Sequence, residues 1–246
     1  MIASLQMYTR PELNEAVYRF WSEIRVSLLE VGIDAPVKLT QDVQEMDVWT
    51  DPNLVFSQTC GMPYRKFLHG KVSIVGTPVY NLENCSPGYY RSCFLVRKTD
   101  QGSSLSDFED KRFAFNDENS QSGFAAPLYH ARVNGLSFFN KIQSHSHLMS
   151  AKMVVLGKAD FAAIDAVTWK LIEHFDDFSS GLRVLEWTDP ERPNLPFITS
   201  VNIDPNQVFL AVEKAIYRLS KKDRDRMNLK GILKIPPQAY LEVPDF

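Results

Sequence analysis

The chain has few cysteines, little net charge and no long apolar run. Its 246 residues include three cysteines and carry a formal net charge of -3. No window approaches the roughly 18 consecutive apolar residues that cross a bilayer. The small charge gives no basic surface for nucleic acid or anionic lipid. The sequence therefore predicts no transmembrane segment and no nucleic-acid partner, and any charged ligand has to be recognised locally.

The three cysteines are Cys60, Cys85 and Cys93, an odd set without metal-ligand spacing. Cys85 and Cys93 can pair only if the loop between them brings their Cα atoms within about 7 Å. The sequence favours free, buried thiols. The first residues lack the basic, apolar and small-residue stretches of a secretory leader. We therefore expect a cytoplasmic protein if the chain is complete as written, and a periplasmic one if a leader was removed.

Apolar residues make up 44% of the chain, enough for a large core, and their periodicity alternates between strands and helices. The first half predicts a helix that begins at Pro11 and ends at Gly32, preceded by a strand at 2–7. Further strands are predicted at 35–40, 53–58 and 71–80. This β-α-β order favours a mixed, mostly parallel sheet covered by helices.

A second α/β series begins with a long strand at 89–98. Strands at 112–116, 137–142 and 160–164 then alternate with helices that begin near Ser122, His147 and Ala166. The last segment, which includes a helix from Asn206 to Leu219, is expected to return to the first series. We therefore predict two lobes, one formed by residues 1–85 and 183–246 and the other by residues 86–182.

A polar turn precedes the helix near Ser122. Asn119, Ser120, Gln121, Ser122 and Gly123 lie where the first N–H groups of that helix have no acceptor within it. One interpretation is that Ser120 or Ser122 is an N-cap. The other is an anion site, in which helix N–H groups and two hydroxyls bind oxyanion oxygens and glycine permits a close approach. No phosphate-binding GxxxxGK[ST] loop is present.

Two other strand ends carry similar polar residues. His145, Ser146 and His147 precede a helix, and Asp165 follows the strand at 160–164. In open α/β sheets, ligands bind beyond the carboxyl ends of the strands, so these residues belong near Ser120 and Ser122. From the other lobe, the strand at 53–58 ends in a further polar set, which consists of Ser57, Gln58, Thr59 and Cys60.

These stretches, taken together, resemble a known family. The segments are "SQTCGMPY", "GYYRSCFLVRK", "NDENSQSG", "SHSHLMSAKMVVLGKADFAAID" and "LRVLEWTDPERPNLPFIT". They are similar to the substrate-binding proteins of phosphate, phosphite and phosphonate ABC transporters, a branch of the type II periplasmic binding proteins. The resemblance runs from about Ala3 to Leu219 and is strongest between residues 54 and 200.

The resemblance implies a two-lobed α/β clamp that closes around a small oxyanion, without catalysis, cofactor or metal. It implies anion-binding roles for Ser120, Gln121, Ser122, Gly123 and His147, with His145 standing where the family has glycine. Also implied as ligand-facing are Asp165, the residues around Thr59 with Ser57 and Gln58, and Tyr8. An ABC permease is the implied partner of a monomer or weak dimer.

Asp165 bears on which anion is bound. A carboxylate beside an oxyanion repels it unless the ligand brings a proton or a cation. Phosphate, phosphite and aminophosphonates do so at neutral pH, and sulfate does not. If Asp165 instead caps the helix that follows it, this discrimination disappears.

Other functions stay open on the sequence alone. Cys60 and His147 would make a thiolate nucleophile and a base if the fold brought them together. His145 and His147 would point to one side of an extended backbone and, with Asp165, form a metal site. A cytoplasmic sensor, or a relative of thiamine-pyrimidine synthesis proteins, would share the same architecture.

Overall fold

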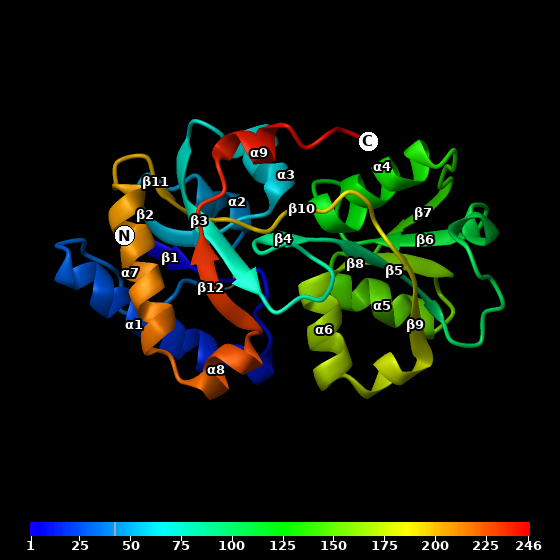
Figure 1. The fold of residues 1–246 in the computed structure, drawn as a ribbon, viewed down its shortest axis with the longest axis horizontal. Helices are drawn as coiled ribbons and strands as arrows, with labels where there is room; N and C mark the ends of the chain where they lie inside the picture. The colour runs from blue at the N-terminus through cyan, green and yellow to red at the C-terminus, as the bar shows by residue number, and fades with distance from the viewer. Residues whose placement is uncertain (42) are drawn as a thin grey trace. The chain divides into compact units, whose positions relative to one another are not determined.

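A computed structural model describes residues 1–41 and 43–246. The chain forms two compact units, shown with their elements labelled in Figure 1. Unit 1 comprises Met1–Glu83 and Pro193–Glu242, and unit 2 comprises Asn84–Arg192 and Val243–Phe246. The chain re-enters unit 1 at Pro193, later than the predicted position 183. The reason is that β9 (Leu182–Trp187) pairs with a strand of unit 2.

Unit 1 is built on a five-stranded sheet of order β1-β2-β11-β3-β12. Strands β1 (Ile2–Ser4) and β2 (Leu54–Gln58) are parallel. Strand β11 (Phe197–Ser200) lies between β2 and β3 (Val72–Tyr80) and is antiparallel to both. Strand β12 (Leu229–Leu233) is antiparallel to β3. Strands β1, β2 and β3 therefore run in one direction, and the two strands from the end of the chain run in the other.

The predicted strand at 35–40 is wrong, because this segment forms no strand. Its backbone is engaged by side chains of the preceding helix. The Trp21 indole donates to the carbonyl of Pro36 at 3.2 Å, and Arg25 donates to the carbonyl of Ala35 at 3.1 Å. Val37 is 73% exposed, so the apolar alternation that suggested a strand does not correspond to a buried face.

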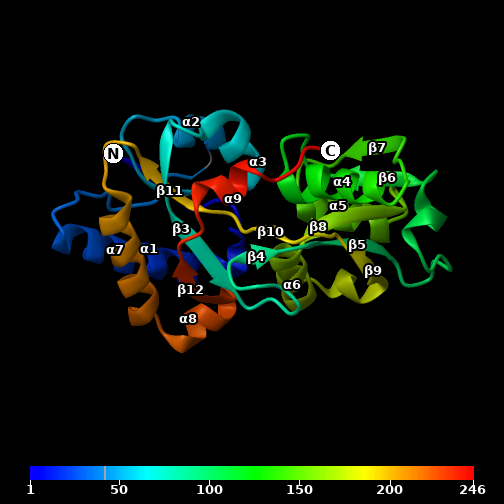
Figure 2. The same cartoon turned by 45° about the horizontal axis from the view of Figure 1, so that its top comes forward.

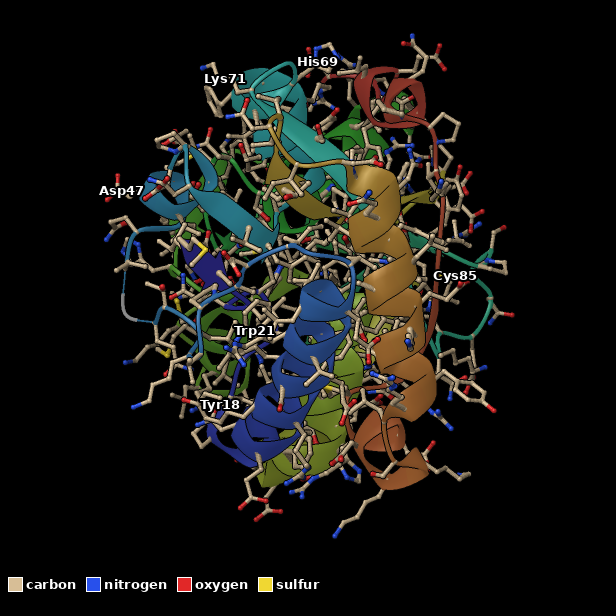
Figure 3. The ribbon with its side chains drawn as sticks, turned by 90° about the vertical axis from the view of Figure 1, so that its left-hand side faces the viewer. Tyr18, Trp21, Asp47, His69, Lys71 and Cys85 are labelled. Atoms are coloured by element: carbon tan, nitrogen blue, oxygen red, sulfur yellow. The ribbon has the colours of Figure 1, made fainter. Side chains whose placement is uncertain are left out.

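Two helices cover one face of the unit 1 sheet, α1 (Asn14–Glu30) and α7 (Pro205–Arg218). Figure 3 shows them side by side, with Tyr18 and Trp21 labelled on α1. The predicted entry through Pro11 is a 3₁₀ turn, η1 (Pro11–Leu13), that leads into α1. Phe20, Trp21 and Ile24 bury their side chains against the sheet, and each contributes about 1.5–3 kcal/mol of burial free energy.

Short elements complete unit 1. They are α2 (Glu45–Trp49), α3 (Gly61–Pro63), the π-turn η2 (Tyr64–Leu68), α8 (Lys221–Arg226) and α9 (Pro237–Leu241). Helix α8 contains the mixed-charge run near the C-terminus, and its Asp223 is bound by both Nε and Nη2 of Arg19 on α1, at 2.9 and 2.8 Å. This pair attaches α8 to α1.

Unit 2 contains a second five-stranded sheet, of order β7-β6-β8-β5-β9. Strand β6 (Arg112–Phe115) is parallel to both β7 (Asn140–Gln143) and β8 (Phe161–Asp165). Strand β5 (Ser92–Arg97) is antiparallel to β8 and to β9. Four of the five strands therefore share one direction, as the alternation of helices and strands predicts.

The two faces of this sheet differ in side-chain size. Cys93, Leu95, Ala114, Ala162 and Ile164 face α5 (His147–Val155) and α6 (Ala166–Phe175), and small residues let these helices pack closely. The opposite face is aromatic, with Phe94, Phe113, Phe115 and Phe161, and it packs against the π-turn η4 (Gln121–Ala125) and α4 (Ala126–Val133). Phe124 of η4 and Phe138 of the loop before β7 complete this cluster. Figures 1 and 2 show α4 and α6 on opposite sides of the sheet.

The remaining elements of unit 2 lie at its edges. They are β4 (Tyr89–Tyr90), the 3₁₀ turns η3 (Leu105–Phe108) and η5 (Asp177–Gly181), and β10 (Arg192–Pro193), where the chain leaves the unit. The last residues of the chain return to this unit: the rings of Phe246 and Phe124 are 5.1 Å apart, and Arg132 donates to the carbonyl of Asp245 at 2.9 Å.

Asp160 anchors the start of β8 to β6. Its carboxylate accepts from Arg112 Nε at 2.9 Å, from the Arg112 backbone N–H at 3.0 Å and from Arg97 Nη2 at 3.2 Å. The hydrogen bonds from Arg112, followed by that from Arg97, hold the pKa of Asp160 well below its usual range. Only 17% of the Asp160 side chain is exposed, so water screens this network weakly.

We predict that Asp160→Asn lowers the free energy of unfolding by about 2 kcal/mol, because two guanidinium groups lose their charged acceptor. Urea denaturation checks this. Asp110→Asn replaces an exposed carboxylate in the same unit and should change stability by less than about 0.5 kcal/mol. Equal losses in the two variants would contradict the role given to Asp160.

Candidate functional site in unit 2

Three parallel strands of unit 2 end at the same edge of the sheet, and each leads into a helix. Strand β6 leads to η4 and α4, β7 leads to α5, and β8 leads directly to α6. The loop after β7 is joined to the end of β6: the Ser144 N–H donates to the carbonyl of Phe115 at 2.8 Å, and the His145 N–H donates to that of Asn116 at 3.0 Å. This pairing brings the predicted residues Ser122 and His147 together.

Ser120 is the N-cap of the turn that begins α4. Its Oγ accepts from the Gly123 N–H at 3.0 Å, as the capping interpretation of this stretch requires. Ala125 donates to the carbonyl of Ser120, five residues back, so the first turn is a π-turn. Such wide turns occur often at functional sites. The cap occupies Ser120 and leaves Ser122 available for another partner.

That partner is His147, the first residue of α5. Ser122 Oγ lies 2.8 Å from His147 Nε2, and Ser120 Oγ lies 3.5 Å from Ser122 Oγ. Ser146 caps α5 by accepting from the Met149 N–H at 3.1 Å. Burial lowers the pKa of His147, while the nearby charge of Asp165 and the backbone of Ala163 act in the opposite direction.

Asp165 is the N-cap of α6, the alternative role that the sequence leaves open. One carboxylate oxygen accepts from the N–H groups of Val167 and Thr168, both at 3.0 Å, and the other accepts from the Thr168 hydroxyl. That second oxygen also lies 3.4 Å from His147 Nε2. Because these bonds hold the carboxylate, its charge acts on the site through His147.

Gly123 is required by close packing. A Cβ atom there would lie 1.9 Å from Asn116 Oδ1 and 3.0 Å from His147 Cε1. Asn116 is not among the residues predicted from the sequence, although its position just after β6 fits the rule that functional side chains follow strand ends. Ser92 is not among them either, and its Oγ donates to the carbonyl of Ser122 at 2.8 Å from the neighbouring β5.

His145 does not form the metal pair that an extended backbone would allow. Its φ is 68°, in the left-handed region that favours glycine. This conformation gives a physical reason for glycine at this position in the family that the chain resembles. Among residues 1–41 and 43–246, no group of three His, Cys, Asp or Glu side chains is placed to hold a metal ion.

The predicted residues of unit 1 surround the end of β2. Gln58 donates to the carbonyl of Leu195 at 3.0 Å and to Tyr80 Oη at 3.3 Å. The rings of Tyr8 and Tyr80 meet edge to face, 5.4 Å apart. Tyr8, Gln58 and Tyr80 therefore form one cluster, and Tyr80, at the end of β3, is the member that the sequence does not predict.

The other two predicted residues of unit 1 are integrated into its fold. Ser57 is buried within β2, where it is in register with Ser4 of β1 and Ile198 of β11. Thr59 is fully buried, and its N–H donates to the carbonyl of Pro196 at 3.0 Å.

No disulfide joins Cys85 and Cys93. Cys93 is completely buried in β5, and burial raises the pKa of its thiol well above the usual value. Within the described part of the chain, no helix combines the length and the apolar character needed to span a membrane.

A separate groove of about 600 Å³ lies elsewhere in unit 2; Arg97, Asp100, Asp107, Lys111 and Asp160 are among the residues that line it. Arg97 forms ion pairs with Asp100 and with Asp160, each with a nitrogen–oxygen distance of 3.2 Å. The groove therefore offers an incoming anion much less positive charge than its composition suggests.

The fold defines a class: the chain has the type II periplasmic-binding-protein fold. PhnD1 from Prochlorococcus marinus, solved in complex with methylphosphonate, superposes with a TM-score of 0.74 at 17% identity, covering 98% of this chain and 94% of that one. A binding protein of an ABC phosphonate transporter from Pseudomonas aeruginosa gives 0.73 at 16% identity, covering 99% and 83%. XAC2383 from Xanthomonas citri, bound to ATP, gives 0.72 at 16% identity, covering 97% and 92%.

Residues 57–237 match the family described as "ABC transporter, phosphonate, periplasmic substrate-binding protein". The chain belongs to this phosphonate-binding family, as the sequence resemblance predicts. Its members are solute-binding proteins, so the thiol-nucleophile alternative for Cys60 is set aside. A comparison with curated proteins finds no match.

We predict that Gly123→Ala destabilises the protein by about 1–3 kcal/mol, because the added methyl group overlaps the Asn116 side chain. Denaturant unfolding measures the loss. Gly231→Ala is the matched control, since a Cβ at Gly231 meets no atom within 4 Å. If the two variants were equally stable, the close approach around Gly123 would not be a constraint on the fold.

Proposed function

We propose that this protein captures a small phosphorus oxyanion, a phosphonate, phosphite or phosphate, for an ABC transporter. The observation that carries the proposal is the pair formed by Ser122 and His147, which lie 2.8 Å apart at the edge where three parallel strands lead into helices. Family membership and the fold shared with methylphosphonate-bound PhnD1 support the same ligand class.

Within unit 2, the ligand replaces the hydrogen bond between Ser122 and His147. The hydroxyl of Ser122 turns from His147 to an anion oxygen, and Nε2 of His147 becomes a second donor. Charge-assisted hydrogen bonds of this kind contribute about 1.5–3 kcal/mol each. The positive ends of the helix dipoles at Gln121 and His147 add about 0.3–1 kcal/mol each.

The remaining predicted residues keep supporting roles in this proposal. Gly123 permits close approach and Ser120 fixes the turn. From unit 1, the proposed ligand-binding residues are Tyr8, Ser57, Gln58 and Thr59. Asp165 acts on the ligand in this proposal through His147, whose Nε2 lies 3.4 Å from the Asp165 carboxylate. The proposed partner is an ABC permease, the binding protein being a monomer or weak dimer, and the proposed compartment is the periplasm of its family.

Thermal unfolding of anion-free protein tests the proposal, with phosphate, phosphite, methylphosphonate, 2-aminoethylphosphonate and sulfate as ligands. An anion at about a hundred times its dissociation constant adds roughly 2.7 kcal/mol and raises the midpoint by about 5–10 °C in a chain of this length. We expect such a shift with at least one phosphorus anion. Because Asp165 caps α6, its charge gives no reason to exclude sulfate, which serves as the comparison anion.

Ser122→Ala should lower the affinity by about tenfold or more, since one charge-assisted hydrogen bond is lost. Ser137→Ala, which alters an exposed serine of the same unit, should leave the shift unchanged. Unchanged midpoints with all four phosphorus anions would reject phosphorus oxyanions as ligands and would favour a sensor of another small molecule.

A further inference from the structure

His147 is held between a hydroxyl and a carboxylate, and its imidazole is largely buried. Nε2 lies 2.8 Å from Ser122 Oγ and 3.4 Å from Asp165 Oδ2, while 14% of the His147 side chain is exposed. Burial disfavours the imidazolium, and the carboxylate favours it. Burial is the larger influence, so the pKa of His147 lies below its ordinary value of 6.5 in the ligand-free protein.

The charges around the ring are few. Helix α5 packs against β5, β6, β8, α6 and η5. The end of β8 provides Asp165, the carboxylate that also caps α6. Strand β5 provides Cys93, a neutral thiol because burial raises its pKa, and η5 packs near Val155 at the far end of α5. After β6, Asn116 is uncharged. On α6, the ionisable side chains begin at Lys170, beyond the first turn that Asp165 caps. Among the described residues, Asp165 is the group whose charge acts on the ring, in the direction that raises the pKa of His147.

We propose that His147 takes up a proton from solvent when the anion binds, so that ligand capture is coupled to pH. The inference rests on the proposed function of Ser122 and His147. An oxyanion at Ser122 adds a second negative charge beside the same Nε2 atom that faces Asp165. In a largely buried site this charge is weakly screened and favours the imidazolium. The protonated Nε2 then donates to the anion.

Asp165 has a defined role in this coupling. It is a positioning residue that raises the proton affinity of His147 and fixes α6, and it does not need to touch the ligand. Its hydrogen bonds with Val167, Thr168 and the Thr168 hydroxyl keep the carboxylate beside the ring. Because repulsion between this carboxylate and the anion is relieved by the proton on His147, the site accepts an anion that brings no cation of its own.

Isothermal titration of the full chain with methylphosphonate tests the inference. Titrations at pH 7 in buffers of different ionisation enthalpy give the number of protons taken up per anion bound. Methylphosphonate exchanges protons itself near neutral pH, so the comparison is between the wild type and His147→Gln, whose amide still donates to the anion. We expect proton uptake by the wild type to exceed that of His147→Gln by about 0.5 proton or more per anion.

The outcomes separate the two claims. Binding with equal proton uptake in both proteins would overturn the coupling and leave the proposed function intact. No binding heat with methylphosphonate, phosphite, phosphate or 2-aminoethylphosphonate would reject the function itself. If only His147→Gln fails to bind, the ring of His147 is titrated directly by ¹H–¹⁵N NMR in the wild type, with the spectrum of His147→Gln identifying its signals. The proton affinity of His147 should then rise at least tenfold on saturation with methylphosphonate, and an unchanged titration would contradict the proposal.

The Asp165→Asn variant separates the charge of Asp165 from its capping role. The asparagine oxygen still accepts from the α6 N–H groups, so the cap is kept while the charge is removed. NMR should show a lower proton affinity for His147 with and without ligand. A titration of His147 that is identical in wild type and Asp165→Asn would show that the carboxylate does not act on the ring.

The lowered pKa of His147 also affects the stability of the ligand-free protein. Since the folded-state pKa of His147 is below 6.5, the unfolded chain binds more protons near that pH. Stability is therefore lost as pH falls through about 6.5, and less is lost in His147→Gln. Saturating methylphosphonate should remove this difference. The same pH dependence of unfolding in the wild type and in His147→Gln would contradict the depressed pKa on which the coupling depends.

Discussion

The junction between the ends of β6 and β7 is the constraint on which the site depends. Two backbone hydrogen bonds, from Ser144 to Phe115 and from His145 to Asn116, join the loops that follow these strands. They place the start of α5 against the turn that begins α4, so a histidine and a serine 25 positions apart in the sequence come within 2.8 Å. Strand β8, parallel to β6, then brings the cap of α6 to the same edge.

The helix caps and the proposed binding groups are different residues of the same short turns. Ser120, Ser146 and Asp165 satisfy the first N–H groups of three helices, which fixes the turns without using Ser122 or His147. The Ser122 hydroxyl and the His147 imidazole are therefore not needed as caps, and they contact each other at 2.8 Å. An oxyanion can replace that contact without unfolding a helix end, as expected of a site that has to bind and release its ligand.

Much of unit 2 could be predicted because its periodicity is strong. The helix 166–175 and the strands around Phe113 and Phe161 follow directly from the apolar pattern, and the rule on strand ends locates Ser122, His147 and Asp165. What could not be predicted is how the oxygens and nitrogens pair, since hydrogen-bond partners distant in sequence leave no periodic signal.

The wrong expectations have definite causes. The 35–40 segment has an apolar alternation, but Trp21 and Arg25 bind its carbonyls and prevent a strand. From the sequence, β9 is expected in the segment that returns to the first lobe, whereas β9 pairs with β5 of unit 2. Nothing in the sequence of β9 shows that β5 is its partner. In unit 1, Tyr80 could not be predicted as a neighbour of Gln58 because it comes from a strand separated from β2 by β11.

The central claim is that a phosphorus oxyanion binds between the Ser122 hydroxyl and the His147 imidazole. A crystal structure of the protein with methylphosphonate tests this most directly. We expect a phosphonate oxygen at about 3 Å from Ser122 Oγ and from His147 Nε2, with the Ser122–His147 hydrogen bond broken. Phosphonate found instead at the groove around Arg97 and Lys111, or an intact Ser122–His147 contact in the complex, would contradict it.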